Sequence, residues 1–405
     1  MSINKIYTRV FHNKNLSLLF AGQLISQMGD SMFMIGLMWL VLELTGSKAM
    51  MGTVALLNYL PMLVVGLFAG VIVDLYDRKK LMLISDFVRA VIVLVIPLCY
   101  YMNWINITII LMVAFLLSSF STVFNPARDS IIPKLIDDGN LVKANSVIQV
   151  SNYTAVLLGP AIAAAAIGVF GVVHLFTADS VTFMISFFTV LFISYKKSPV
   201  EKLNKNSIMF HLSEIVRYIH NQKKTRFLLA LTAVNNFFIM GPAIVGIPIF
   251  VKEVLKEGAS TYALVESSYG IGMFVGGVLI NYLKNIIGKG KILLIGLMFD
   301  GFTYTLIYFI GSSELMMLLI AFHAIEIPLI VVSRTSLIQE WTEDTKIGRV
   351  FSLVNMAVVG MTALTTGITG ILAEIVPVEI IFGLFGIGGM VCGFIGWMYR
   401  ELREG

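Results

Sequence analysis

Charged residues are scarce in this chain. Asp, Glu, Lys and Arg make up 13% of its 405 residues, whereas soluble domains contain about 25%. Hydrophobic residues make up 58%, which is more apolar surface than a soluble fold can bury. The composition therefore excludes an ordinary soluble domain. It also argues against nucleic-acid binding, because the net charge of +5 is not gathered in a basic soluble domain.

Cysteine is rare in this chain, and nucleotide-binding motifs are absent from the sequence. The two cysteines, Cys99 and Cys392, lie in apolar stretches and form no disulfide or metal-binding pattern. The sequence has no Gly-x-x-x-x-Gly-Lys-Ser/Thr loop, which would cradle ATP phosphates, and no zinc-protease motif. We therefore expect a protein that is not an enzyme and that uses no cofactor and no metal.

Long apolar segments fill most of the chain. About 20 helical residues cross a bilayer core of roughly 30 Å. The segments are apolar on all sides rather than alternating, so they predict helices and not a β-barrel. We expect an all-α membrane protein with twelve transmembrane helices, of which the first is long enough to be tilted or interrupted at Gly29 and Asp30. The spans lie near residues 16–44, 50–74, 81–101, 106–126, 143–169, 171–194, 226–252, 261–283, 291–311, 314–334, 348–373 and 377–399.

Positive charges fall almost entirely on one side of the predicted membrane. With the amino terminus placed inside, only Lys48, Lys252 and Lys256 of the 29 Lys and Arg residues lie in outside loops, and Arg89 lies within the third span. Cytoplasmic segments carry such an excess of Lys and Arg. We therefore expect a multi-pass protein of a bacterial-type inner cell membrane, with both termini in the cytoplasm.

A basic segment divides the twelve spans into two sets of six. The expected parts are a bundle at 1–195, a linker at 196–225 and a second bundle at 226–405. Residues 208–219 of the linker have helical spacing and one apolar face, which predicts an amphipathic helix on the inner membrane surface. Two parallel six-span repeats are typical of secondary transporters. A constant offset of 206 residues pairs Gly66 with Gly272, Gly70 with Gly276, Asp30 with Asn236, and Arg128-Asp-Ser-Ile-Ile132 with Arg334-Thr-Ser-Leu-Ile338.

The turn after the second span carries the most informative motif. Two glycines on one helix face allow another backbone to approach closely, and an acid and three bases follow them. Helix packing alone would explain the glycines, and membrane topology alone would explain the bases. The acid, Asp74, can also accept hydrogen bonds from the N-terminus of a facing helix, and the helix expected near Ile347 is its natural partner. The predicted inner gate comprises Gly66, Gly70, Asp74, Arg78, Lys79 and Lys80.

These motifs resemble those of the major facilitator superfamily. The turn is similar to the Gly-x-x-x-Asp and Arg-Lys signature of that family, although Leu75 replaces the usual base after the acid and Asp77 replaces a glycine. In span five, Gly159 and Pro160 among small residues resemble the antiporter motif of the exporters, with alanine at three glycine positions. The runs at 124–146 and 348–353 resemble the branch that holds macrolide-efflux proteins and the enterobactin exporter.

The resemblance implies two pseudo-symmetric six-helix bundles that rock about a central cavity, lined by spans one, four, seven and ten. On these spans it favours Asp30 and Glu326 as proton-coupling residues and Asn235 and Asn236 as substrate contacts. Many proton-coupled exporters of the superfamily carry an arginine in the middle of span four, but residues 112–120 contain none. A proton site must therefore be built from other residues.

Ionisable side chains within the spans are the candidates, because a charge in lipid is costly and marks function, and a carboxyl there can hold a proton near neutral pH. His323 lies one turn before Glu326, so the two could form a relay. A metal is disfavoured because no third ligand is evident nearby. Each acid has a structural alternative, and Asp86 with Arg89 is best explained as a local ion pair. The proton-coupling candidates are Asp30, Glu326, Asp300, Asp179 and His323.

Together these features predict a secondary transporter that exports amphiphilic or hydrophobic small molecules, such as drugs, macrolides or siderophore-like compounds. The expected mechanism is proton antiport with alternating access. The expected partners are the small-molecule substrate, protons or sodium, and the lipid bilayer, and the expected functional unit is a monomer. The alternatives are uptake or lysolipid flipping by the same fold, or a membrane sensor that binds a ligand without moving it.

Overall fold

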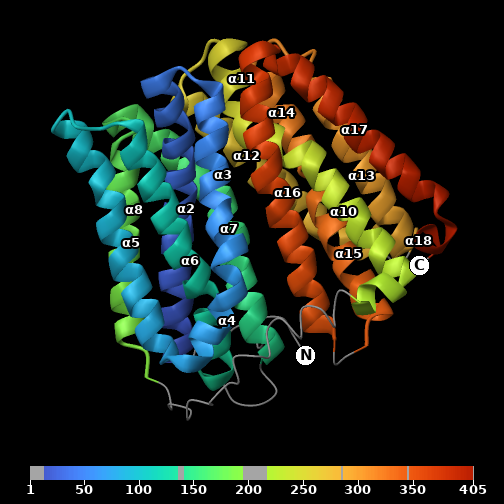
Figure 1. The fold of residues 1–405 in the computed structure, drawn as a ribbon, viewed down its shortest axis with the longest axis horizontal. Coiled ribbons are helices and arrows are strands. Elements are labelled where there is room, and N and C mark those ends of the chain that lie inside the picture. Colours follow the sequence, from blue (N-terminus) through green and yellow to red (C-terminus); the bar gives the residue numbers. More distant parts are fainter. Residues whose placement is uncertain (1–12, 136–140, 195–216, 284–285, 344–345, 405) are drawn as a thin grey trace. The chain divides into compact units, whose positions relative to one another are not determined.

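The computed structural model describes residues 13–135, 141–194, 217–283, 286–343 and 346–404. All regular structure in these ranges is helical (Figure 1), as expected for an all-α membrane protein. By its internal contacts the chain divides into two compact units. Unit 1 comprises residues 1–45 and 60–203, and unit 2 comprises residues 46–59 and 204–405. The segment 46–59 thus groups with unit 2, although the sequence places it in the first bundle.

The described residues contain 11 helical segments long and apolar enough to cross a membrane. The second expected span is not among them, because it is divided into two shorter helices. These are α3 (Lys48–Val64) and α4 (Gly66–Leu75), which meet at Val65. Taken together, α3 and α4 cover the second of the twelve segments that the sequence predicts. The glycine motif of the inner turn therefore begins a new helix instead of continuing a long one.

Unit 1 is built around the long helix α2 (Lys14–Thr45). α2 runs without a break through Gly29 and Asp30, so the interruption considered there does not occur. It packs against α6, α7 and α8, and α5 packs against α6 and α8. The bounds of these helices are Arg78–Tyr101 for α5, Ile107–Leu135 for α6, Leu141–Phe170 for α7 and His174–Leu191 for α8.

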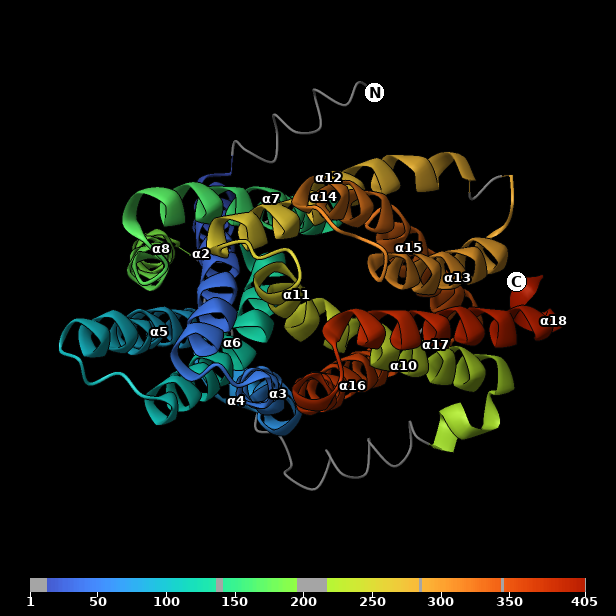
Figure 2. The same ribbon diagram turned by 90° about the horizontal axis from the view of Figure 1, so that it is seen from above.

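Unit 2 contains the remaining helices, and two of its spans are interrupted. The seventh span consists of α10 (Lys223–Gly241), a short π-helix (Pro242–Gly246) and α11 (Ile247–Glu253). The tenth consists of α14 (Ser313–His323) and α15 (Glu326–Trp341), separated by two residues. The other helices are α12 (Ala259–Leu283), α13 (Lys289–Ile307), α16 (Ile347–Ile375), α17 (Val378–Met398) and α18 (Arg400–Arg403). Among them, α13 and α17 run side by side (Figure 2).

The start of α3 docks on unit 2 through polar contacts. The carboxylate of Glu374 on α16 accepts hydrogen bonds from the Ser47 hydroxyl at 2.7 Å and the Ala49 backbone N–H at 2.9 Å. Lys48 forms an ion pair with Glu253 at 2.6 Å. Glu374 therefore satisfies two donors at the N-terminus of α3, where the helix has no intrahelical partners.

Two predicted features fall partly or wholly outside the described residues. Of the amphipathic helix expected at 208–219, only the end is described, and residues 217–221 are helical. The side chain of Asp74 also lies outside the described part of the chain, so its expected contact stays a prediction.

Candidate functional site

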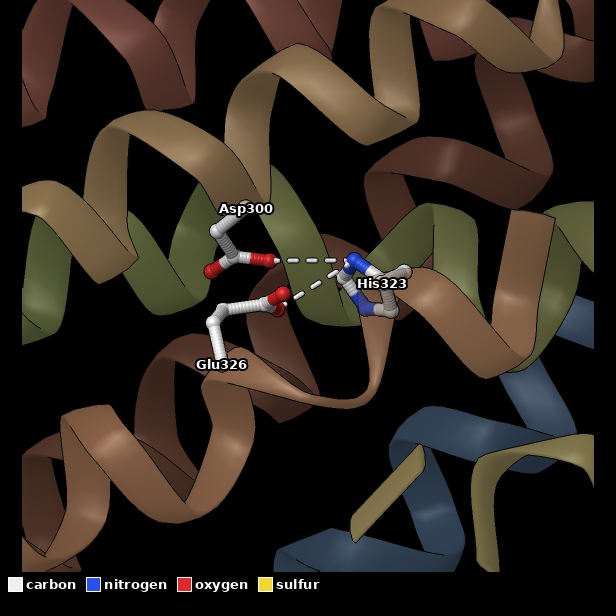
Figure 3. A group of neighbouring side chains, drawn as sticks. All are labelled: Asp300, His323 and Glu326. Carbon is white, nitrogen blue, oxygen red and sulfur yellow. Dashed lines mark ion pairs between the residues drawn. The ribbon is translucent and has the colours of Figure 1, made fainter. Parts of the chain in front are cut away.

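Three ionisable side chains meet in the interior of unit 2. Asp300 comes from the middle of α13, His323 ends α14, and Glu326 begins α15. Their ligand atoms all lie within 4.8 Å of one another, and Figure 3 shows the three side chains pointing toward one another. The Nδ1 atom of His323 is 3.3 Å from Oε1 of Glu326 and 3.7 Å from Oδ1 of Asp300. All three residues are at least 95% buried.

The break between α14 and α15 brings His323 and Glu326 to this point. Ala324 and Ile325 form the turn between the helices, so the histidine falls in the last turn of one helix and the acid in the first turn of the next. A cation at a helix C-terminus and an anion at an N-terminus are both stabilised by the helix dipole. Discontinuous helices of this kind form binding sites in secondary transporters.

Polar neighbours outside the group hold two of its members but not the third. The Asn235 side-chain amide donates to Oδ2 of Asp300 at 2.8 Å, and the Thr303 hydroxyl lies 2.9 Å from Nδ1 of His323. Both carboxyl oxygens of Glu326 are buried and receive no hydrogen bond from a polar neighbour outside the group among the described residues, while the Asp300 carboxyl lies within hydrogen-bond reach of Glu326. No lysine or arginine of the described chain pairs with either acid. The group thus contains two carboxyls and an imidazole with no permanent positive charge.

An aromatic layer covers the histidine. The rings of Tyr304 and Tyr269 lie 4.6 and 5.7 Å from the imidazole, measured between ring centroids, and their hydroxyls are 3.0 Å apart. Glu266 lies on the same face of α12 as Tyr269, three residues earlier. Its carboxylate forms no hydrogen bond or ion pair with any described residue. Glu266 is not among the candidates predicted from sequence, although an acid inside a predicted span is itself an indication of function.

The reason given from sequence against a metal, the lack of a third ligand, is wrong, because Asp300 supplies one. Distances of 3.3 and 3.7 Å from Nδ1 are near the roughly 3.4 Å separation of ligands around a tetrahedral zinc. However, the Thr303 hydroxyl lies within hydrogen-bond distance of Nδ1, the nitrogen that a metal would need. A metal at Nδ1 would therefore have to displace the Thr303 hydroxyl.

A second group of ionisable side chains lies inside unit 1. Asp86 and Arg89 form the expected ion pair, and the Ser186 hydroxyl donates to Asp86 at 2.8 Å. Asp179 is fully buried, and its Oδ2 has no hydrogen-bond partner among the described residues. Asp30 interacts electrostatically with both Asp179 and Arg89. Unit 1 therefore brings Asp30 and Asp179 together, but beside a guanidinium that the group in unit 2 lacks.

The two asparagines proposed as substrate contacts have different surroundings. Asn235 is buried and donates to Asp300 in the interior of unit 2, and its role as a substrate contact stays a prediction. Asn236 is half-buried and donates to the backbone carbonyl of Thr232 in its own helix. Glu326 is 1% exposed, and its expected place at the cavity likewise stays a prediction.

The inner-turn residues have local structural roles within unit 1. Asp77 caps α5 by accepting from the backbone N–H of Lys80 at 3.0 Å, which explains the acid in place of the family glycine. The Lys79 ammonium donates to the carbonyls of Leu191 and Ile193, both at 2.8 Å, and so caps the C-terminus of α8. For Arg78, the predicted role in the inner gate stays a prediction.

Within the described residues, no backbone lies close to the glycines of the inner turn, so the expected close approach stays a prediction. A Cβ at Gly66 would meet only Thr122 at 3.7 Å, and one at Gly70 would meet no described atom within 4 Å. In the antiporter-like motif, by contrast, a Cβ at Gly159 would lie 2.7 Å from Cβ of Ser31. The motif of Gly159 and Pro160 therefore allows α7 to pack tightly on α2.

Interrupted membrane helices that meet at buried ionisable side chains are typical of secondary membrane transporters. The chain is a member of the transmembrane secretion effector family of the major facilitator superfamily, whose family model matches residues 9–403. The recognition made from the sequence motifs is thereby confirmed.

Characterised relatives match over nearly their whole length. The chain is 23% identical over 390 residues to macrolide efflux protein A of Streptococcus pyogenes, covering 95% of this chain and 96% of that protein. It is 24% identical over 397 residues to the staphyloferrin A transporter of Staphylococcus aureus, covering 94% and 93%. These relatives are transporters and not enzymes, and they place the chain in the macrolide-efflux branch.

Solved structures share the fold. The nucleoside transporter NupG matches with a TM-score of 0.78 and 11% identity, covering 94% of this chain and 99% of that chain. A bacterial homologue of the human lysosomal transporter Spinster, solved in an inward-facing conformation, matches with a TM-score of 0.72 and 11% identity, covering 96% and 95%. At these identities the likeness establishes the fold alone.

Proposed function

We propose that this transporter exports amphiphilic or hydrophobic small molecules in exchange for protons, by alternating access of its two six-helix halves. The similarity to a macrolide efflux protein over nearly the full length of both chains supports the direction and the cargo class. A macrolide and staphyloferrin A are the cargoes to test first, since the two relatives are named for these compounds.

The buried group of Asp300, His323 and Glu326 carries the proposal of proton coupling. Two carboxylates a few ångströms apart in apolar surroundings repel each other, and neither is neutralised by a basic side chain. One proton held between them removes most of that cost. The imidazole at 3.3 and 3.7 Å offers a path by which the proton enters or leaves.

The groups that face this site from the packed helices define its charge. They are Tyr304 from α13, Tyr269 and Glu266 from α12, and Asn235 from α10, and none of these is basic. In unit 1 the Asp30 and Asp179 pair is a second candidate, but Arg89 nearby already compensates part of its charge. The group in unit 2 therefore fits proton uptake and release better.

Flux in proteoliposomes tests the proposal. With the protein reconstituted and a pH-sensitive dye inside, an imposed pH gradient should drive uphill movement of the cargo, and the cargo should in turn move protons. A sodium gradient of equal size serves as the control. Cargo movement driven only by the sodium gradient would show that sodium, not the proton, is the coupling ion. Cargo movement in the same direction as the protons would establish uptake instead of export. Binding of the cargo without movement would establish a membrane sensor.

A further inference from the structure

The two halves of the chain carry an arginine at the same repeat position, and its surroundings differ between them. Arg128 near the end of α6 and Arg334 on α15 occupy the same position in the two halves, 206 residues apart. In unit 1 the guanidinium is satisfied. Its Nη1 donates to Oε1 of Gln23 at 2.9 Å, and its Nε pairs with Oδ1 of Asp129 at 2.8 Å.

Both partners are replaced in the second half. The position that matches Asp129 holds Thr335, and the position that matches Gln23 holds Leu229. The Arg334 guanidinium is half-buried and forms no hydrogen bond or ion pair with any residue in the described ranges. A guanidinium has five donors and cannot lose its charge. The second half thus keeps the cation while losing the groups that satisfied it in the first.

Arg334 lies at the inner end of the tenth expected span, which covers residues 314–334. It is seven residues before Trp341, the last residue of α15, which is about 10 Å along the helix. An arginine near the end of a span extends its charge toward the membrane interface, where the anionic group of an amphiphile can reach it. The planar fork of arginine matches carboxylate and phosphate groups with two parallel hydrogen bonds.

We propose that Arg334 binds an anionic group, a carboxylate or a phosphate, carried by the transported amphiphile. The inference rests on the proposed function, because it assigns part of the cargo. It narrows the cargo class to amphiphiles that bear a negative charge. Arg334 follows Glu326 by eight residues on α15, about 12 Å along the helix, so the site is distinct from the Asp300, His323 and Glu326 group.

Binding of a dansyl-labelled undecanoic acid tests the inference without requiring transport. Its methyl ester has the same chain and dye but no charge. Energy transfer from tryptophan to dansyl reports binding to the purified protein in phosphatidylcholine nanodiscs. The acid should bind at least about tenfold more tightly than the ester, since charge-assisted hydrogen bonds are the stronger ones. Because no flux is measured, a failure here is distinct from a failure of export.

Two variants and two matched controls locate the effect. Arg334→Gln should abolish the preference for the acid, and Thr335→Asp should do the same by restoring the internal carboxylate that Asp129 supplies to Arg128. Thr335→Asn, which has the same shape without the charge, and Arg128→Gln should both keep the preference. Where Arg334→Gln fails to fold, Thr335→Asp decides.

The opposing outcomes are equally specific. Equal binding of acid and ester to the unaltered protein would overturn the inference, as would a preference that survives both Arg334→Gln and Thr335→Asp. A preference that disappears when phosphatidylglycerol replaces part of the phosphatidylcholine would assign Arg334 to a lipid headgroup phosphate and would overturn its assignment to cargo.

Discussion

Gly276 on α12 lies directly against the carbonyl group of Ile325, the residue that precedes Glu326. A Cβ at this glycine would lie 2.9 Å from the carbonyl carbon of Ile325 and 3.1 Å from Cδ of Pro328. Gly272, one turn earlier, packs in the same way on Ala321. The glycine pair therefore lets α12 lie against the break between α14 and α15, where the ionisable group is assembled.

Replacing Gly276 with alanine is expected to displace the break. The added methyl must push the Ile325 backbone, and such overpacking costs about 1–3 kcal/mol. We expect a lower unfolding temperature and a loss of proton-coupled transport that exceeds the loss of folded protein. Gly277→Ala is the matched control, because a Cβ there meets no described atom within 4 Å. Equal behaviour of the two variants would contradict this role.

Lys79 is expected to stabilise unit 1 rather than to act in a gate. Its ammonium caps the two carbonyls at the end of α8, so Lys79→Met should cost about 1–2 kcal/mol of stability. Transport per folded molecule should change little. Lys80→Met, at an exposed position of the same turn, should leave the thermal unfolding curve unchanged. A transport defect in Lys79→Met at unaltered stability would instead favour the gate.

Glu374 is expected to hold the start of α3 on unit 2. Glu374→Ala removes the acceptor of both the Ser47 hydroxyl and the Ala49 N–H, and loss of a cap costs about 1 kcal/mol. Hydrogen exchange at residues 47–55 should accelerate about fivefold or more. Glu379→Ala, an acid at the start of α17, should leave exchange in this segment unchanged. Unaltered exchange in Glu374→Ala would show that the cap contributes nothing.

Much of the fold could be predicted because lipid restricts the choice of structures. Long apolar runs and the distribution of bases are sufficient to predict helical spans and two repeats. The break at Val65 could not be predicted, because it falls at neither a proline nor a polar run. The break at Ala324 and Ile325 had a signal in Pro328, which lacks the N–H that would bond to the carbonyl of Ala324. Pro242, at the start of the π-helix, is a sequence signal for the interruption of the seventh span, whereas hydropathy alone shows one continuous span.

The candidate site was predicted only in part, for a similar reason. His323 and Glu326 are neighbours in sequence, so helical spacing pairs them. Asp300 joins them from another helix, and its side chain is fixed by Asn235, a long-range contact that no local pattern encodes. In the charged turn, the capping contacts of Lys79 and Asp77 could not be predicted from sequence, and the part of Lys79 in a gate stays a prediction.

Cargo-dependent proton movement in proteoliposomes that hold Glu326→Gln or Asp300→Asn measures the role of the buried group most directly. Both variants remove a carboxyl while keeping its shape, and Glu314→Gln, an exposed acid at the start of the same span, is the control. We expect dye-reported proton flux to fall to the background of empty liposomes in the two variants and to persist in the control. Undiminished coupling in both variants would contradict proton carriage by Asp300, His323 and Glu326.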